Sequence, residues 1–280
     1  MFEGKAMSKK AKRKMEKNVR ISIFISIFIV ITLLISLKYE NKTIPTEAQN
    51  ISSKKIEWGI KRNNNNEQPD VGATNKKLIE ENNGICIGNK DSKKIYLTFD
   101  LGYEAGYTNQ ILDVMKENEV TGTFFITAHY LNTSEELVKK MIDNGNIVGN
   151  HTVNHKCMAQ INEETLKKEV MDLHEAMKEK LNYEMKYLRP PKGEFSEKSL
   201  IQTTSLGYQT VMWSFAYADW DEKKQPSEEE GKNKILENLH NGEIMLLHAT
   251  SKTNANILND VLKEIKNKGY EIKSLDEFEK

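Results

Sequence analysis

The sequence predicts an α/β fold, a distorted or incomplete (β/α) barrel of about seven parallel strands. From Lys94 onward, short runs rich in β-branched and aromatic residues alternate with longer stretches of helical period, which is typical of parallel strands joined by helices. The expected strands are 94–100, 122–127, 146–150, 186–189, 209–215, 243–248 and 270–273, and the expected helices are 108–118, 134–143, 163–181, 196–205, 227–240 and 254–268. Seven repeats favour a barrel. A doubly wound open sheet is the alternative, but no glycine-rich phosphate loop supports it.

The first strand ends at an acidic residue, Asp100, and a turn through Gly106 follows it. Parallel α/β folds place their catalytic groups where a strand ends and a loop begins. Asp is also a favoured N-cap residue, so this position alone is equally consistent with a cap for the helix expected at 108–118. The interpretation of Asp100 therefore depends on what the other strand ends contain.

Composition and charge limit the class of protein. The chain has 280 residues, and 38% of them are hydrophobic, enough for a substantial core. The net charge is zero, but residues 1–20 hold eight Lys and Arg against two Glu, which leaves the remainder acidic by six charges. Because nucleic-acid binding needs a basic face, this acidic remainder argues against nucleic acid as the main partner.

The first 55 residues are divided by composition. An uncharged, mostly aliphatic run at 21–37 follows the basic residues, at the short end of the ~20 residues that usually cross a bilayer. A cleavable signal peptide is the alternative, but no small-residue cleavage site follows this run. We expect residues 1–20 to be a basic cytoplasmic tail, 21–37 a transmembrane signal anchor, 38–55 an extracytoplasmic linker and 56–280 the folded domain.

The two cysteines, Cys86 and Cys157, are too far apart for a C-x-x-C redox or zinc motif. We expect free, structural thiols. A disulfide is the alternative, because the domain is expected outside the cell.

Residues with acid–base or metal-binding side chains follow most of the predicted strands. They are Asp100, His129, His151, His155, Arg189, Asp219 and His248. The carboxyl ends of parallel strands meet at one rim of a barrel, so these side chains are expected to lie together. Four of the six histidines belong to this set, whereas His174 and His240 are within helical stretches. This sorting favours an active site over scattered structural histidines.

His151 and His155 are spaced i, i+4, so one turn of helix would point both imidazoles the same way. Imidazole is a common ligand of zinc and other transition metals. A lone H-x-x-x-H pair is a weak signal. Its position directly after a short strand, facing Asp100 across the predicted barrel, makes it a candidate metal site.

Five motifs in the expected order resemble those of the polysaccharide deacetylases, the NodB-homology group of carbohydrate esterases. They are Thr98–Asp100, His151–His155, Arg189–Pro191, Asp219–Trp220 and Leu246–His248. Residues 96–104, 187–191 and 213–216 resemble more closely the branch that de-N-acetylates muramic acid to form the δ-lactam of the spore cortex. The resemblance extends from about Trp58 to the C-terminus and implies the NodB-homology barrel.

The resemblance implies a role for each matching residue. Asp100 would be the general base that takes a proton from water, and Arg189 would keep it ionised. His248 would protonate the departing amine, with Asp219 fixing its tautomer. The predicted substrate contacts are Tyr103, Glu104, His129, Pro190 and Trp220.

The resemblance also implies that His151 and His155 hold a divalent metal ion, with zinc or cobalt expected, which polarises the acetamide carbonyl. The wider family has a second Asp in its first motif, and that Asp is a metal ligand. Here the position is Leu101, which can neither ligate nor hydrogen-bond. We therefore expect weak metal binding, unless Glu104, water or substrate completes the coordination shell.

These expectations describe a hydrolase of amide C–N bonds that de-N-acetylates N-acetylmuramic acid in the peptidoglycan glycan strand, toward the muramic δ-lactam. The second expected partner is the cytoplasmic membrane, through 21–37. The expected location is membrane-anchored with the catalytic domain extracytoplasmic, on the cell-wall side or in the forespore intermembrane space. Two alternatives stay open: a deacetylase of N-acetylglucosamine or chitin-type glycans, and a catalytically silent glycan-binding relative.

Overall fold

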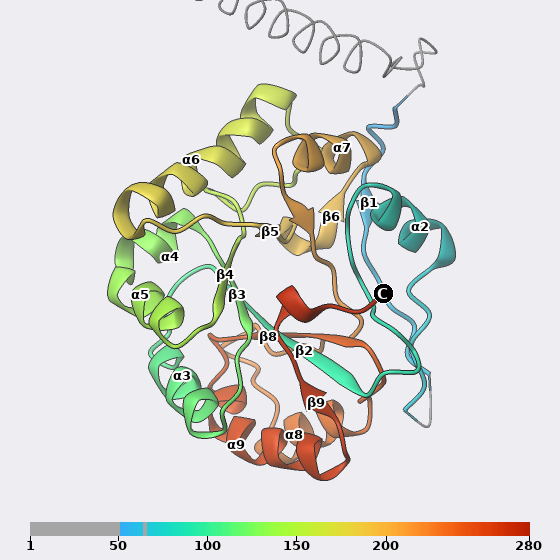
Figure 1. The fold of residues 1–280 in the computed structure, drawn as a ribbon, viewed down its shortest axis with the longest axis vertical. Helices are drawn as coiled ribbons and strands as arrows, with labels where there is room; N and C mark the ends of the chain where they lie inside the picture. Colours follow the sequence, from blue (N-terminus) through green and yellow to red (C-terminus); the bar gives the residue numbers. More distant parts are fainter. Residues whose placement is uncertain (1–50, 64–65) are drawn as a thin grey trace, which may run out of the picture. The chain divides into compact units, whose positions relative to one another are not determined.

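The computed structural model describes residues 51–63 and 66–280, in which helices surround a curved parallel sheet (Figure 1). The strand order is β7-β5-β4-β3-β2-β8, and β9 also pairs with β2. The strands are β2 (Lys94–Leu101), β3 (Thr123–Ile126), β4 (Ile147–Asn150), β5 (Tyr187–Leu188), β7 (Gln209–Thr210), β8 (Glu243–His248) and β9 (Glu271–Ile272). Each of the seven predicted strands is present, although most are shorter than their predicted ranges, β7 most of all.

The connections between these strands contain the predicted helices and one more. The helices are α3 (Thr108–Glu117), α4 (Ala128–Thr133), α5 (Glu135–Asp143), α6 (Glu163–Leu181), α7 (Glu197–Ser205), α8 (Glu228–Leu236) and α9 (Lys252–Asn267). Among these connecting helices, α4 alone lies outside the predicted ranges. Before β2, the chain forms α2 (Ala73–Glu81) and the strand β1 (Ile56–Glu57), which pairs antiparallel with β6 (Glu194–Phe195). Short 3-10 turns, η1 (Pro191–Gly193) and η2 (Leu275–Glu277), complete the described elements.

Capping residues explain where several helices begin. Ser196 and Ser227 start α7 and α8 with reciprocal capping boxes. The side chain of Asn162 accepts a hydrogen bond from the backbone N–H of Thr165 at the start of α6. Each cap satisfies a backbone donor that the first helical turn leaves without a partner.

The sheet curves so far that one segment reaches both of its edges. Residues 209–210 pair with β5 at one edge, and Phe215 bridges in parallel to Met245 of β8 at the other. Next to this bridge, the backbone N–H of Ser214 donates to the carbonyl of Ile244 at 3.0 Å. The two edges of the sheet meet at an isolated bridge rather than along a continuous ladder of hydrogen bonds, so the barrel is not fully closed. The prediction of an incomplete (β/α) barrel is therefore confirmed.

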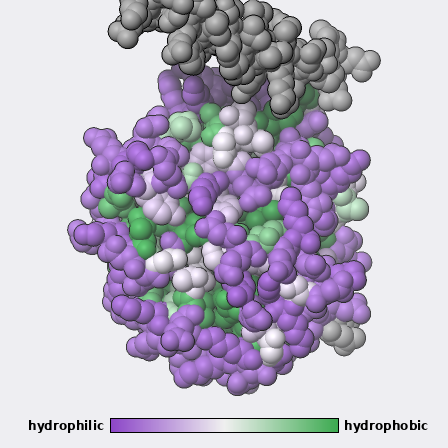
Figure 2. Space-filling view, viewed as in Figure 1, coloured by the Kyte–Doolittle hydropathy of each residue, from purple (hydrophilic) through white to green (hydrophobic). Residues whose placement is uncertain are grey.

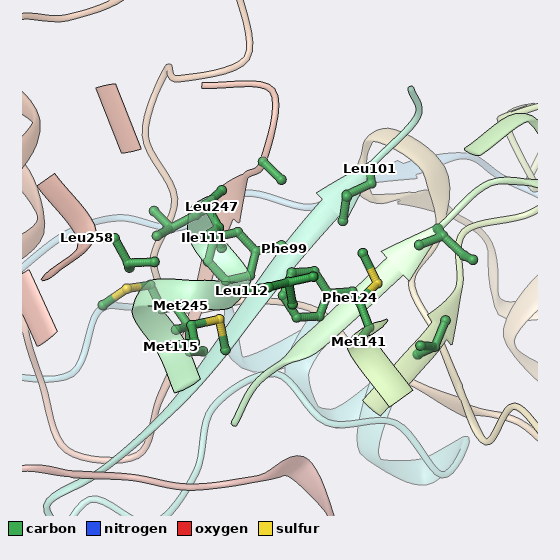
Figure 3. Packing of buried hydrophobic residues seen from close by; sticks show 14 of the residues in the cluster. Phe99, Leu101, Ile111, Leu112, Met115, Phe124, Met141, Met245, Leu247 and Leu258 are labelled. Carbon is green, nitrogen blue, oxygen red and sulfur yellow. The ribbon is translucent and has the colours of Figure 1, made fainter. Parts of the chain in front are cut away.

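Alternation along β2 divides its side chains between two cores. Phe99 and Leu101 pack with residues of α3 and α9 in the layer between the sheet and the helices (Figure 3). Tyr96 belongs to a second cluster on the other face of the sheet, inside the barrel. Successive side chains of a strand point to opposite faces, so Asp100 shares the face of Tyr96. Outside these cores, hydrophilic residues cover most of the face seen in Figure 2.

The expected membrane anchor and membrane-anchored location require correction. Within residues 51–63 and 66–280, no helix is both long enough and apolar enough to cross a bilayer. The longest helix within these described residues, α6, has 19 residues, but charged side chains occur along its whole length. The span expected at 21–37, the tail at 1–20 and most of the linker lie outside the described residues. The membrane is therefore not part of the functional argument that follows.

Candidate active site

A cleft of about 680 Å³ opens at the carboxyl ends of β2 and β8. Its acidic, basic and imidazole lining residues are Asp100, His151, His155, Lys192 and His248. Aromatic side chains form much of the remaining wall, from Tyr103, Trp213, Tyr217 and Trp220. The fold thus brings the expected base, acid and metal-binding histidines to one site, as the positions of the strand ends predict.

Asp100 is paired with a fully buried arginine. Arg189 Nη1 donates to Asp100 Oδ1 at 2.8 Å, and the guanidinium carbon lies 4.3 Å from the centre of the Phe125 ring. Burial of Asp100 opposes its ionised form, but the positive charge of Arg189, followed by those of nearby histidines, outweighs burial and lowers the pKa of the carboxyl. Asp100 is therefore a carboxylate at neutral pH and can accept a proton.

His151 and His155 meet through a loop, which corrects the expectation of a helical turn. Thr152 and His155 have positive φ angles of 68° and 55°, so this segment reverses direction. The side chain of Asn150 accepts from the N–H of Thr152 at 2.8 Å, and the Thr152 hydroxyl accepts from the N–H of His155 at 3.1 Å. The two ring centres lie 4.8 Å apart. Local hydrogen bonds, rather than helical periodicity, therefore place the two imidazoles side by side.

The environment of His151 fixes its tautomer. Its Nδ1 is 2.8 Å from the carbonyl oxygen of Arg189, which can only accept, so Nδ1 holds the proton. Its Nε2 faces Asp100 Oδ2 at 3.6 Å. Burial lowers the pKa of His151 to about 4, and burial also lowers the pKa of His155. Both imidazoles are therefore neutral at pH 7, the state that can bind a metal ion.

His248 is held by a buried carboxylate. Its Nδ1 donates to Asp219 Oδ1 at 2.7 Å, and its backbone N–H donates to Asp219 Oδ2 at 2.8 Å. Asn254 Nδ2 also donates to Asp219 Oδ2, at 2.6 Å, and the hydroxyl of Tyr217 donates to Asn254. Burial disfavours the imidazolium, but the hydrogen bond and negative charge of Asp219 outweigh burial and raise the pKa of His248. The ring is therefore suited to deliver a proton through Nε2.

Two of the five predicted substrate contacts line the cleft, and the other three lie outside its lining. Tyr103 and Trp220 line the cleft, and the Trp220 ring lies 6.0 Å from that of His248. Glu104 instead accepts hydrogen bonds from the N–H of Gly106 and the hydroxyl of Tyr130, outside the cleft lining. His129 and Pro190 are also absent from that lining. The substrate-binding role of all five residues stays a prediction.

Two residues of the site were not singled out from the sequence. Lys192 lines the cleft, and Asn254 supports Asp219 from α9. Neither belongs to a motif, and both reach the site through a turn or helix packed against the barrel rim. Only tertiary structure reveals them.

Leu101 is fully buried in the core between the sheet and the helices. The site therefore lacks the carboxylate that the wider family offers to metal, and this residue does not face the cleft. The described residues contain no group of three or more His, Cys, Asp or Glu side chains arranged to hold a metal ion. His151 and His155 nevertheless present two neutral imidazoles on one side of the cleft, which fits a site with two protein ligands.

Cys86 and Cys157 are both free thiols, so the expectation of unpaired cysteines is confirmed. Cys86 is buried, and burial raises the pKa of its thiol to about 12. Neither cysteine lines the cleft.

Comparison with known proteins identifies the family. Residues 87–211 match the family described as polysaccharide deacetylase. The chain is 40% identical over 237 residues to the peptidoglycan-N-acetylmuramic acid deacetylase PdaA of Bacillus subtilis, covering 84% of this chain and 90% of that protein. A solved structure of that protein, described as a family 4 carbohydrate esterase, superposes with a TM-score of 0.79, covering 81% of this chain and 98% of that one. A peptidoglycan-N-acetylglucosamine deacetylase of Bacillus cereus is 30% identical over 186 residues, 65% of this chain and 66% of that protein.

This chain belongs to the polysaccharide deacetylase family. It is a hydrolytic deacetylase with the half-barrel fold of the family 4 carbohydrate esterases.

Proposed function

We propose that this enzyme removes the acetyl group of N-acetylmuramic acid in peptidoglycan glycan strands. The observation that supports this most directly is the joint position of the Asp100–Arg189 and His248–Asp219 pairs on one cleft. The 40% identity to a relative named for this activity, over 84% of the chain, supports the choice of sugar. The complete acid–base set argues against a silent glycan-binding relative.

The proposed reaction begins with Asp100. Its carboxylate takes a proton from a water molecule, whose oxygen adds to the acetamide carbonyl. Arg189 keeps the carboxylate oriented and ionised before this step. The C–N bond then breaks as His248 gives a proton to the departing nitrogen. The products are acetate and a free amine on C2 of the sugar.

The second pair makes that proton transfer possible. An amide nitrogen leaves poorly unless it is protonated, so the acid must hold its proton near neutral pH. The Nδ1–H bond to Asp219 fixes the imidazole with Nε2 toward the cleft. Asn254 in turn orients Asp219 by a hydrogen bond. His248 is therefore held by a buried carboxylate whose own hydrogen bonds are satisfied.

Enzymes of this family generally use a divalent metal ion, and we propose His151 and His155 as its protein ligands here. When bound, such an ion supplies positive charge that polarises the acetamide carbonyl. The carbonyl of Arg189 holds His151 in the tautomer whose Nε2 is free for this role. Zinc and cobalt both suit imidazole ligands.

The freed amine explains the proposed product. In muramic acid it is next to the lactyl ether on C3. Attack of the amine on the lactyl carboxyl forms the C–N bond, breaks the C–OH bond with loss of water, and closes a six-membered δ-lactam. We propose that the enzyme acts on the route to this lactam. A peptidoglycan-N-acetylglucosamine deacetylase is also a relative, at 30% identity, which keeps N-acetylglucosamine as the second candidate sugar.

Mass spectrometry of muropeptides before and after incubation with the enzyme tests the proposal. Loss of one acetyl mass from muramic acid residues is the expected result. Loss confined to glucosamine residues would replace the first candidate sugar with the second.

A further inference from the structure

Lys192 supplies the only lysine or arginine side chain among the described residues that line the cleft. It follows Pro191 in η1 and is exposed to solvent. Arg189, three residues earlier, is fully buried and its guanidinium is paired with the carboxylate of Asp100. Lys192 is therefore the positive group that an incoming substrate meets.

The backbone holds Lys192 in an unfavourable conformation. Its φ and ψ angles are 59° and 7°, in the left-handed region that residues with a Cβ rarely adopt. The next residue, Gly193, packs so closely that a Cβ there would lie 2.6 Å from the Trp213 ring. The carbonyl of Gly193 also accepts from the N–H of Trp58 at 2.9 Å. Such strain persists only where the surroundings enforce it, and it gathers at functional sites.

The ammonium group of Lys192 is free to bind an anion. Within the part of the chain that the structure describes, it makes no hydrogen bond or ion pair. The nearby carboxylate of Glu194 is instead bound to Lys55 at 3.0 Å. Lys192 lines the same cleft as Asp100, His155 and His248, which places its charge at the reaction site.

We propose that Lys192 binds the free lactyl carboxylate of N-acetylmuramic acid and thereby sets the preference for this sugar over N-acetylglucosamine. This inference rests on the proposed function. The lactyl ether is on C3, next to the C2 acetamide that must reach Asp100 and His248, so the carboxylate enters the same cleft. N-acetylglucosamine has only a hydroxyl at C3 and cannot form the ion pair. A muramic residue whose lactyl group is amidated by a stem peptide cannot form it either.

Binding and turnover of two matched ligands test the assignment. One ligand is a peptide-free muramyl tetrasaccharide, and the other is a chitin tetrasaccharide. Each is titrated by calorimetry into wild type, Lys192→Met and Lys192→Arg, and acetate release is measured in parallel. Methionine keeps most of the length of the side chain and the backbone strain while removing the charge. Lys198→Met, on α7 and outside the cleft lining, controls for a general loss of positive charge.

The expected result is an increase of about tenfold in Kd for the muramyl ligand in Lys192→Met, the order given by loss of one hydrogen-bonded charge. This increase in Kd should shrink at high salt and should be absent for the chitin ligand and for Lys198→Met. In turnover, the loss should appear in KM rather than kcat. Lys192→Arg should largely restore the affinity for the muramyl ligand. An equal loss for both ligands, or unchanged muramyl binding, would overturn the assignment. Wild type that binds the muramyl ligand but releases no acetate from it would instead contradict the proposed function, because the binding comparison stands without turnover.

Discussion

Asp100 and His248 are register partners on the neighbouring parallel strands β2 and β8. Partner residues project from the same face of a sheet, so the carboxylate and the imidazole both reach the cleft. Each has its own buried partner of opposite charge, Arg189 for Asp100 and Asp219 for His248. These partners lower the pKa of Asp100 and raise the pKa of His248, after burial has opposed each charge. The proposed base and the proposed acid can therefore coexist in the protonation states that their roles require.

Loss of either group should abolish most activity without unfolding the protein. Asp100→Asn and His248→Ala are each expected to lower kcat by at least ~10²-fold, the usual contribution of general acid–base catalysis. Acetate release and thermal unfolding measured on the same samples check this. His174→Ala, which removes an imidazole from α6, serves as the control. Near-normal turnover in either variant at unchanged Tm would remove that residue from the mechanism.

The pH profile should report the support that Asp219 gives to His248. As the proposed acid, His248 must be protonated, so activity is expected to fall as pH rises through its pKa, which Asp219 raises. Asp219→Asn removes the negative charge and should move this alkaline limb to lower pH, with lower kcat. Asp221→Asn, on the same loop, should leave the limb in place. Profiles of kcat against pH that coincide for wild type and Asp219→Asn would show that the limb belongs to another group.

Metal binding should be weak and should depend on two histidines. Because Leu101 removes one anionic ligand, the purified protein is expected to hold substoichiometric metal, and added zinc or cobalt should raise acetate release. His151→Ala and His155→Ala should each abolish this response, and both should lower the metal content found by elemental analysis. His174→Ala should respond like wild type. Full wild-type activity in excess chelator, with no metal detected, would falsify the role of metal.

Restoring an acidic residue at position 101 should damage the fold rather than tighten the metal site. Leu101 is fully buried with Phe99 between the sheet and the helices, so Leu101→Asp places a carboxylate without a partner in the core. A loss of about 3 kcal/mol or more in the free energy of unfolding is expected, against less than ~1.5 kcal/mol for the volume-conserving Leu101→Met. Urea unfolding and zinc titration check both parts. Tighter zinc binding with unchanged stability would mean that the side chain can reach the cleft.

A buried carboxyl at the start of β8 should make stability depend on pH. Glu243 is fully buried, and burial raises its pKa well above 4.5. A raised folded-state pKa means that the stability Glu243 contributes is complete below pH 4.5 and is lost as pH rises toward that pKa. Glu243→Gln stays neutral, so its stability relative to wild type should increase with pH, by up to ~1.4 kcal/mol per pH unit.

Urea unfolding of both proteins at several pH values from 4.5 upward measures this difference. The exposed Glu237→Gln should show no such trend. Parallel curves for wild type and Glu243→Gln would mean that Glu243 is ionised in the fold.

The sequence by itself determined the strand order along the chain and the side chains at the strand ends. Hydrophobic runs of four to eight residues separated by helical stretches are enough to predict parallel strands, because each pattern reflects local geometry. Asp100 and His248 could be predicted for the same reason, because a polar residue at the carboxyl end of a buried parallel strand lies at the rim of the barrel.

Tertiary structure decided the partners of these residues and the other walls of the cleft. The i, i+4 spacing of His151 and His155 suggested a helix, but hydrogen bonds accepted by the side chains of Asn150 and Thr152 favour a loop with two left-handed residues. Lys192 and Asn254 have no local signature, since a turn packed on Trp213 and a helix on another part of the chain place them. The direction of Leu101 followed from strand alternation only once the interior face of the barrel was known. Contacts between residues distant in sequence fix these features, and no short segment contains that information.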